Sequence, residues 1–363
     1  MATPSLRTDA RCVELGFLEK CEPWVVKSKY FPSKVGGKPA WLHLKNIPDG
    51  EHLSCQNCGE PCVFLLQVYA PIDDIDSAFH RTLFLFVCVA PGCLNKNKTG
   101  SFVILRSQLP RINNFYGGEP PIETEEGSDS PSARDFGNLC VVCGALGNKT
   151  CAKCRARHYC SKSHQVADWK SGHKFQCGSQ LDDDAAKSAT TGGGVLFPEY
   201  ELITEPEDDV CDSHAAADKS DEQRLSDYRA FLSKHPDCSD VDSAMNANDL
   251  NNMAATCQDK AFWKFKKIIE KAPHQVLRYN PGASPLLVSS EDAPDAIPNC
   301  PNCGSERQFE FQVLPQLLNE IVESNSESLD WGTLIVYTCK QSCDGDKPYL
   351  DEFIWKQDFS KQE

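Results

Sequence analysis

Eight cysteine and histidine residues at the spacing of zinc ligands lie within one stretch of 38 residues, and they constrain the fold of the chain more than any other sequence feature. They form four pairs, which in chain order are Cys140 and Cys143, Cys151 and Cys154, Cys160 and His164, and His173 and Cys177. A segment this short cannot bury enough apolar surface to fold alone, whereas a structural zinc ion contributes about 10–16 kcal/mol in small fingers. Thiolate and imidazole are good zinc ligands, so the spacing predicts a finger folded around two zinc ions.

Eight further cysteines form two similar sets on either side of this stretch. The first set is Cys55, Cys58, Cys88 and Cys93, and the second is Cys300, Cys303, Cys339 and Cys343. When Cys55 is aligned with Cys300, identical residues follow in register at Asn57 and Asn302, Cys58 and Cys303, Gly59 and Gly304, Phe64 and Phe309, Gln67 and Gln312, and Val68 and Val313. Chance seldom gives so many matches, so the alignment predicts an internal repeat.

Each cysteine set is expected at the base of an antiparallel hairpin. Strand-like runs cover residues 63–70 and 82–89 in the first copy, and residues 308–314 and 332–338 in the second, with a short helical insertion at 317–322. Pairing of the two runs brings the two cysteine pairs together. Four thiolates fill a tetrahedral structural site and leave no open position for chemistry, so we expect one zinc ion per copy. The alternative is that the pairs are simply buried cysteines.

The fold class that follows is mainly β with some α. Two related zinc-knuckled β repeats are expected to pack together as one body, because duplicated small sheets leave apolar faces to bury. A small zinc finger is inserted between them and is expected to be tethered outside that body. The other six cysteines lack a partner at ligand spacing and are interpreted as ordinary residues: Cys12, Cys21, Cys62, Cys211, Cys238 and Cys257.

Composition divides the chain into five segments. They are an N-terminal zinc-knuckled repeat at 1–118, an acidic linker at 119–137, the finger at 138–178, a disordered acidic connector at 179–223, and a C-terminal repeat led by a helix at 224–363. Residues 181–227 carry fourteen acids against three bases, whereas the finger carries seven Lys or Arg and one acid, Asp168. The acidic segments either shield this basic finger or are ordinary solvated loops.

The formal charge of −15 over 363 residues argues against nonspecific binding to phosphate backbones and favours a basic partner. Twenty cysteines would suit a disulfide framework only in a short secreted chain, and no basic-then-apolar leader opens the sequence. The longest apolar run, residues 83–90, is far below the ~18 residues that a membrane helix needs. We therefore expect a soluble intracellular protein without a membrane partner.

The central stretch resembles the MYND finger family, down to Tyr159-Cys160-Ser161-Lys162 and Asp168-Trp169-Lys170. The resemblance implies cross-braced pairing, with one zinc ion on Cys140, Cys143, Cys160 and His164 and the other on Cys151, Cys154, His173 and Cys177. His164 stands where most of the family has cysteine, which a tetrahedral site tolerates. MYND fingers are protein-interaction modules that often take proline-containing peptides, here on the helix face from Gln165 to Trp169. Trp169 either packs on the zinc core or contacts that ligand.

The chain as a whole resembles the programmed cell death protein 2 family. The resemblance rests on the finger between two cysteine repeats and on three stretches, Leu15-Gly16-Phe17, Gly37-Lys38-Pro39-Ala40-Trp41-Leu42 and Leu277-Arg278-Tyr279. It implies a zinc-dependent protein that is a dedicated chaperone of one small-subunit ribosomal protein, the fifth in universal naming. Its place would be ribosome biogenesis, in cytoplasm and nucleus. A free ribosomal protein is cationic, which suits an acidic partner.

Two other functions stay open. Some lysine methyltransferases carry a MYND finger, but neither repeat shows a cofactor-binding glycine motif or a catalytic arrangement, so we expect no enzymatic activity. MYND fingers of nuclear regulators recruit corepressors, which makes a transcriptional cofactor the main alternative. No DNA-binding pattern accompanies the finger, and direct DNA binding is not expected.

Overall fold

One antiparallel sheet of 11 strands dominates the computed structural model, which describes residues 12–94, 99–122, 131–178, 195–210, 260–322 and 329–359. Its strands are β1 (Glu14–Glu19), β2 (Lys34–Val35), β3 (Val63–Tyr69), β4 (His80–Val87), β5 (Phe102–Leu109), β8 (Tyr200–Pro206), β9 (Leu277–Tyr279), β10 (Arg307–Val313), β11 (Thr333–Cys339), β12 (Leu350–Asp351) and β13 (Phe353–Gln357). They run in the order β12-β5-β4-β3-β2-β8-β1-β9-β10-β11-β13. The expected mainly β architecture is confirmed.

Helices are few and short. Those of α type are α1 (Lys162–Asp168), α2 (Lys174–Gln176), α7 (Lys260–Ile269) and α8 (Leu318–Ile321). Single 3-10 turns are η1 (Ser28–Tyr30), η2 (Asp76–Ala78), η3 (Ala133–Asp135) and η6 (Pro315–Leu317), and a wider turn, η4 (Trp169–His173), continues α1. Among these described helices, none has the length and apolarity that crossing a lipid bilayer requires.

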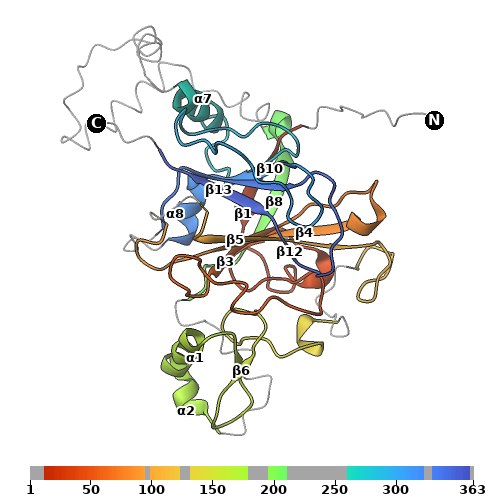
Figure 1. Cartoon of the computed structure of the whole chain (residues 1–363), viewed down its shortest axis with the longest axis vertical. Coiled ribbons are helices and arrows are strands. Elements are labelled where there is room, and N and C mark those ends of the chain that lie inside the picture. The colour runs from red at the N-terminus through yellow and green to blue at the C-terminus, as the bar shows by residue number, and fades with distance from the viewer. Residues whose placement is uncertain are drawn as a thin grey trace, which may run out of the picture.

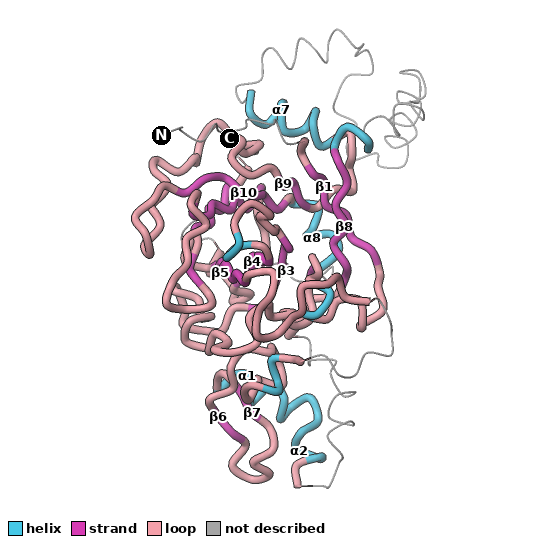
Figure 2. Tube along the Cα trace, turned by 90° about the vertical axis from the view of Figure 1, so that its right-hand side faces the viewer, coloured by secondary structure: helices cyan, strands magenta, loops and turns pink. Residues whose placement is uncertain are grey.

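The sheet lies in the middle of the molecule, with α7 at one end and the finger at the other (Figure 1). The finger contains α1, α2 and a separate ribbon of β6 (Lys149–Thr150) and β7 (His158–Tyr159). A view from the side shows the same order of parts (Figure 2).

The two ends of the sheet meet in one short stretch of chain. Leu350 and Asp351 of β12 pair with Arg106 and Leu105 of β5, and β13 then pairs with β11 at the other end. Between them the Glu352 N–H donates to a β5 carbonyl. The sheet therefore curves until its first and last strands are neighbours, as its right-handed twist favours.

β8 is a strand that the sequence analysis missed. Residues 179–223 were expected to be a disordered connector, and this is wrong for residues 195–210, where β8 pairs with β1 over six residues and with β2 on its other side. Only Leu202 of β8 is fully buried, so its sequence stays polar and resembles the acidic segments around it. The rest of that connector, and residues 123–130 of the acidic linker, lie outside the described residues.

Successive side chains of β4 enter two different cores, because neighbouring residues of a strand point to opposite faces. Leu83 and Leu85 join a core that also holds Val313 and Leu334. Since β10 and β11 come from the C-terminal half of the chain, the two halves share this core.

The opposite face of β4 packs toward the finger. Phe84 and Phe86 lie in a second core with Trp41, whose ring centroid is 5.1 Å from that of Phe84. The Trp41 indole Nε1 donates to the carbonyl of Gly144 in the finger at 2.8 Å, and Val142 belongs to the same core. The expectation of a finger merely tethered outside the body is therefore wrong, because it shares a core with the N-terminal half.

Buried ion pairs fasten the two halves together. Arg81 on β4 donates to both carboxylate oxygens of Glu310 on β10, at 2.7 and 3.0 Å, and each side chain is only 2% exposed. Burial alone would raise the pKa of Glu310, but the Arg81 guanidinium lowers it below its ordinary value. Arg106 and Arg307 likewise share Glu352, at 2.7 and 3.0 Å.

We predict that Glu310→Gln lowers the free energy of unfolding by about 3–5 kcal/mol at pH 7, because it leaves the Arg81 charge buried and unpaired. Urea unfolding of the zinc-loaded chain, followed by tryptophan fluorescence, measures this. Folding lowers the pKa of Glu310, so its contribution is complete above the unfolded pKa and is lost as pH falls through the folded pKa.

The matched control is Glu270→Gln, which removes the same charge from an exposed pair with Lys266 at 3.9 Å. An exposed pair contributes roughly 0.5 kcal/mol or less. Equal losses in the two variants would contradict a fastening role for the buried pair.

Candidate metal centres

Sixteen cysteine and histidine side chains gather in four groups of four, and within each group the ligand atoms lie within 4.8 Å of one another. The groups are Cys55, Cys58, Cys88 and Cys93; Cys140, Cys143, Cys160 and His164; Cys151, Cys154, His173 and Cys177; and Cys300, Cys303, Cys339 and Cys343. The structure thus brings together the sixteen residues predicted as zinc ligands, in the four groups that were expected.

Hairpins build the two groups of the large sheet. Pairing of β3 with β4 places the Cys58 sulfur 3.7 Å from that of Cys88. Pairing of β10 with β11 places the Cys303 sulfur 3.5 Å from that of Cys339. Each group therefore depends on correct strand register, and it closes the open end of its hairpin.

A left-handed residue follows each C-x2-C pair. Gly59, Gly144 and Gly304 have φ of +74°, +78° and +76°, and Arg155 has +59° in the fourth pair. In all four, the N–H donates to the carbonyl of the pair's first cysteine. Glycine adopts this conformation without strain, so a C-x2-C-Gly pattern marks three of these turns in the sequence.

The first finger group is buried throughout. The Cys143 and Cys160 sulfurs are 3.5 Å apart, and the Nδ1 atom of His164 lies 3.1 Å from Cys160 and 3.6 Å from Cys140. Burial alone would lower the pKa of His164, but the sulfurs of Cys140 and Cys160 raise it to about 9. The Nδ1 atom of His164 therefore faces two of the three sulfurs of its group.

The second finger group uses the other ring nitrogen of its histidine. His173 Nε2 lies 3.4 Å from Cys151 and 3.6 Å from Cys154, and the Cys151 and Cys177 sulfurs are 3.8 Å apart. Its ligands alternate along the chain with those of the first group. The two groups therefore share one stretch of chain and cannot be separated into two independent segments.

The spacing within the groups fits a tetrahedral zinc ion. Zinc–sulfur bonds of about 2.3 Å place neighbouring sulfurs about 3.8 Å apart. Five sulfur–sulfur distances, at least one in each group, are 3.5–3.8 Å. Four protein ligands per group would complete the coordination, as in structural zinc sites.

Three other cysteines of the described residues lie outside these groups. Cys62 is buried beside the first group, and burial raises the pKa of its thiol. Cys12 and Cys21 also lie outside the four groups. The other three, Cys211, Cys238 and Cys257, are outside the described residues.

The finger helix α1 is fixed by side chains on both sides. Ser161 caps its first turn by accepting from the His164 N–H, and Asp168 at its end accepts from Arg157 at 2.8 Å and from the Tyr159 hydroxyl at 2.7 Å. Trp169 follows, with its ring edge-on to the His173 imidazole at 5.7 Å.

The outer face of this helix is partly apolar and open. Trp169 is 38% exposed and Val166 41%, and Phe175 at the finger tip is 84% exposed. Trp169 therefore both contacts the zinc-ligand core and presents an edge to the surface. These side chains could meet a partner without any rearrangement of the finger.

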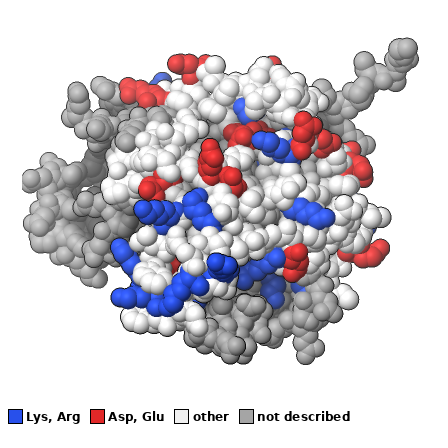
Figure 3. All heavy atoms as spheres, turned by 60° about the horizontal axis from the view of Figure 1, so that its bottom comes forward, with Lys and Arg blue, Asp and Glu red and all other residues white. Residues whose placement is uncertain are grey.

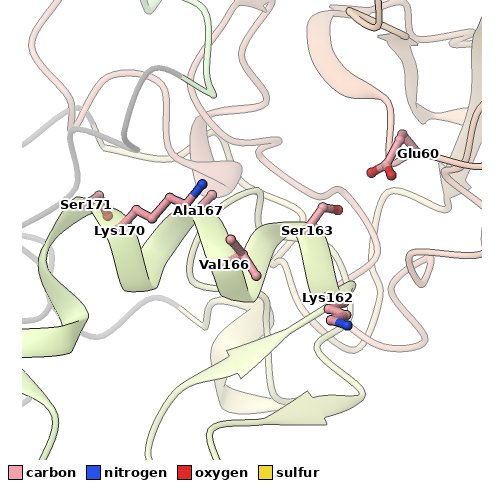
Figure 4. Close-up of a pocket in the computed structure, with 7 residues that line it drawn as sticks. All are labelled: Glu60, Lys162, Ser163, Val166, Ala167, Lys170 and Ser171. Carbon is pink, nitrogen blue, oxygen red and sulfur yellow. The ribbon is translucent and has the colours of Figure 1, made fainter.

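A groove of about 720 Å³ runs along one face of α1 and η4 (Figure 4). The helix supplies Val166 and Ala167, with Lys162 and Lys170 at its rim, and Glu60 from the N-terminal half stands opposite. We call this surface the finger groove. Because Glu60 belongs to the body, the finger groove exists only where the finger is docked.

The finger end of the molecule is basic. Lys and Arg side chains gather in the lower half of Figure 3, where this end has been turned forward. The exposed cations of the finger are Lys149, Lys153, Arg155, Lys162, Lys170 and Lys174. The single acid, Asp168, is engaged by Arg157.

The residues of the body that hold the finger were not predicted from the sequence. Lys38 Nζ donates to the Val141 carbonyl at 2.7 Å, beside the Trp41 contact. A side chain at Gly50 would come within 2.7 Å of the Cys160 carbonyl. The stretch from Gly37 to Leu42, which carries the resemblance to a family, is therefore part of the finger's docking surface.

Comparison with known proteins covers all three parts of the chain. The model "Programmed cell death protein 2, N-terminal domain" matches residues 12–123, and the model of the C-terminal domain of the same family matches residues 259–358. The MYND finger model matches residues 140–177. No solved structure matches the chain.

Curated relatives match over most of their length. "Programmed cell death protein 2" of Mus musculus is 42% identical over 357 residues, which cover 95% of this chain and 96% of that protein. "Programmed cell death protein 2-like" of the same species is 29% identical, over 87% and 86%. "Probable 20S rRNA accumulation protein 4" of Schizosaccharomyces pombe is 25% identical, over 87% and 89%. The chain belongs to the programmed cell death protein 2 family.

Proposed function

We propose that this chain is a zinc-dependent protein-binding protein that acts as a dedicated chaperone of a basic small-subunit ribosomal protein in ribosome biogenesis. Zinc would occupy all four groups, two in the finger and one in each half. Since four protein ligands complete each group, its role would be to hold structure, and the chain would bind rather than catalyse. Its place would be the cytoplasm and the nucleus.

The observation that carries this proposal is the separation of charge between the finger and the rest of the chain. The finger at 138–178 is basic, which leaves 51 acidic and 30 basic residues elsewhere, a formal charge of −21. Because residues 181–227 hold fourteen of these acids against three bases, a cationic client would be steered to this acidic segment between the finger and the C-terminal half, and away from the finger. Lasting affinity needs an apolar or strand-edge contact in addition, because charge alone would bind every basic protein.

The Schizosaccharomyces pombe relative supports the client class. Its name refers to accumulation of a ribosomal RNA, and its match covers 87% of this chain. We extend this to the present chain and identify the client as a basic protein of the small ribosomal subunit, with the fifth in universal naming as the first candidate.

Recruitment of peptides by the finger is the second candidate function. It is favoured by the finger groove, where Val166 lies exposed between Lys162 and Lys170. Proline-containing segments of transcriptional regulators would be typical ligands of a MYND finger. This function would use the finger groove, whereas the chaperone function would use the two halves.

We further propose that the two halves arose by duplication. In each half, the buried glutamine of the repeat motif accepts from the N–H of the residue that follows an upstream proline. Gln67 accepts from the Ala40 N–H at 2.9 Å, and Gln312 accepts from the Leu286 N–H at 2.7 Å. Both strands also carry a register shift at the matching place, next to Phe64 and Phe309. Equivalent details of this kind support a common ancestor of the halves.

We predict four zinc ions per purified chain, measured by elemental analysis. Cys140→Ser should lower the count by one or two, because the two finger groups interleave. Cys62→Ser is the matched control, since Cys62 is a buried cysteine outside the groups, and it should keep four. A wild-type value near two would mean that the cysteines of the halves are only buried thiols.

We predict that co-expression of the full chain raises the soluble yield of one small-subunit ribosomal protein far above that of the others in a panel. Raised salt should slow association of that pair more than it speeds dissociation, because charge steers the encounter.

Val166→Asp should leave this solubilisation intact while it abolishes peptide recruitment through the finger groove, and Ile112→Asp, at an exposed site away from the finger, should affect neither. Solubilisation of no panel member, or of all members equally, would refute the dedicated-chaperone function. If Val166→Asp abolishes solubilisation of the client and Ile112→Asp does not, the client binds at the finger groove.

A further inference from the structure

A second cavity, of about 530 Å³, lies where the N-terminal half meets the turn that enters the finger and the start of β8. Five cationic side chains line it: Lys27, Lys29, Lys34, Lys38 and Arg134. Its acidic side chains are only Asp135 and Glu199. This excess of cations stands out in a chain whose formal charge is −15.

Both acidic side chains are already engaged. The carboxylate of Glu199 contacts the ammonium group of Lys34, which is almost fully buried. Asp135 Oδ2 accepts from the backbone N–H of Ser132 at 2.7 Å and from its hydroxyl at 3.2 Å, which closes the η3 turn. Asp135 keeps its negative charge in these contacts with neutral donors, so the lining of the cavity carries a net formal charge of +3.

Three of the cations have no acidic partner in the part of the chain that the structure describes. Among the described residues, no carboxylate lies within 4.0 Å of Lys27, Lys38 or Arg134. Lys38 is partly buried and donates to the Val141 carbonyl at 2.7 Å. Burial lowers the pKa of Lys38, and Arg134 is close enough to lower it further. Cys140, Cys143 and Asp168 act on Lys38 in the opposite direction, from the finger side. Inside the cavity itself cations outnumber acids by five to two, and such an excess of cations favours an anion.

The size and lining of the cavity restrict the class of ligand that can bind there. A single phosphate ion fills only a small part of about 530 Å³, so the anion is expected to be carried on a larger group. The cavity is lined by Pro23, Pro39 and Pro131, with Val26 and Ala40, and no aromatic ring lines it. A nucleotide base would find nothing to stack on, whereas an extended peptide suits such walls.

We propose that this cavity binds a phosphorylated serine or threonine side chain presented by an extended peptide. Arg134 and Lys27 would supply the charge for the phosphate dianion, with Lys38 at the inner wall. Lys38 also holds the finger through Val141, and Arg134 lies in the turn that leads into the finger. A bound phosphopeptide would therefore join the body to the entry of the finger, at a place separate from the finger groove.

Calorimetry on the zinc-loaded full chain tests this with four probes at constant ionic strength. They are the capped pentapeptide Ala-Ala-phosphoserine-Ala-Ala, the same peptide without phosphate, inorganic phosphate and adenosine monophosphate. We expect the phosphopeptide to bind at least tenfold more tightly than inorganic phosphate or the nucleotide, and the unphosphorylated peptide not to bind. No binding of the phosphopeptide at millimolar concentration, or equal affinity for the nucleotide, would overturn the proposal.

Paired variants locate the site. Lys27→Gln combined with Arg134→Gln should weaken phosphopeptide binding at least tenfold. Both side chains are exposed at the mouth of the cavity, so we expect the fold and the zinc content to be unchanged. Lys264→Gln combined with Lys340→Gln removes the same charge from exposed positions outside the cavity and should leave the affinity unchanged. If both double variants weaken phosphopeptide binding equally, the effect is one of net charge and the proposed site is refuted.

Discussion

Burial of β4 on both of its faces is the constraint on which the rest of the structure depends. Leu83 and Leu85 fill the core shared by the two halves, and Phe84 and Phe86 fill the core shared with the finger. A strand can serve two cores only where every residue is buried, which explains the unbroken apolar run in its sequence. The halves and the finger are therefore parts of one folded unit rather than modules on a string.

This unit separates surfaces of different chemistry. The finger presents exposed apolar side chains among cations, and its finger groove is completed by Glu60 of the body. Outside the finger the acids concentrate in residues 181–227, which carry fourteen acids against three bases. The buried pairs Arg81–Glu310 and Arg106–Glu352 keep the two halves in register.

The sequence predicted those features that local spacing determines. Ligand type and spacing predicted the sixteen ligands, because zinc chemistry restricts both, and the resemblance to MYND fingers implied which of the finger's ligands share a group. The four hairpin strands also lie where expected, with β3 and β10 leaving their C-x2-C turns. Long-range pairing could not be predicted in the same way. β8 buries only Leu202 and resembles an acidic linker, and closure of the sheet by β12 depends on β5, more than 200 positions away. The docking of the finger depends on Trp41 and Gly50, whose sequence context gives no hint of a contact with it.

The central structural claim is that the finger and the body form one cooperative unit. Hydrogen exchange of the zinc-loaded full chain tests it by measuring the opening free energy of individual backbone amides. Backbone amides of the finger's docked loop, residues 140–147, should open with the same free energy and the same denaturant dependence as those of β4 and β11. Trp41→Ala should uncouple them, because it removes the indole contact to Gly144. If the finger amides of the wild type instead exchange through an opening of much lower free energy that Trp41→Ala does not change, the finger is an independent module and the account is contradicted.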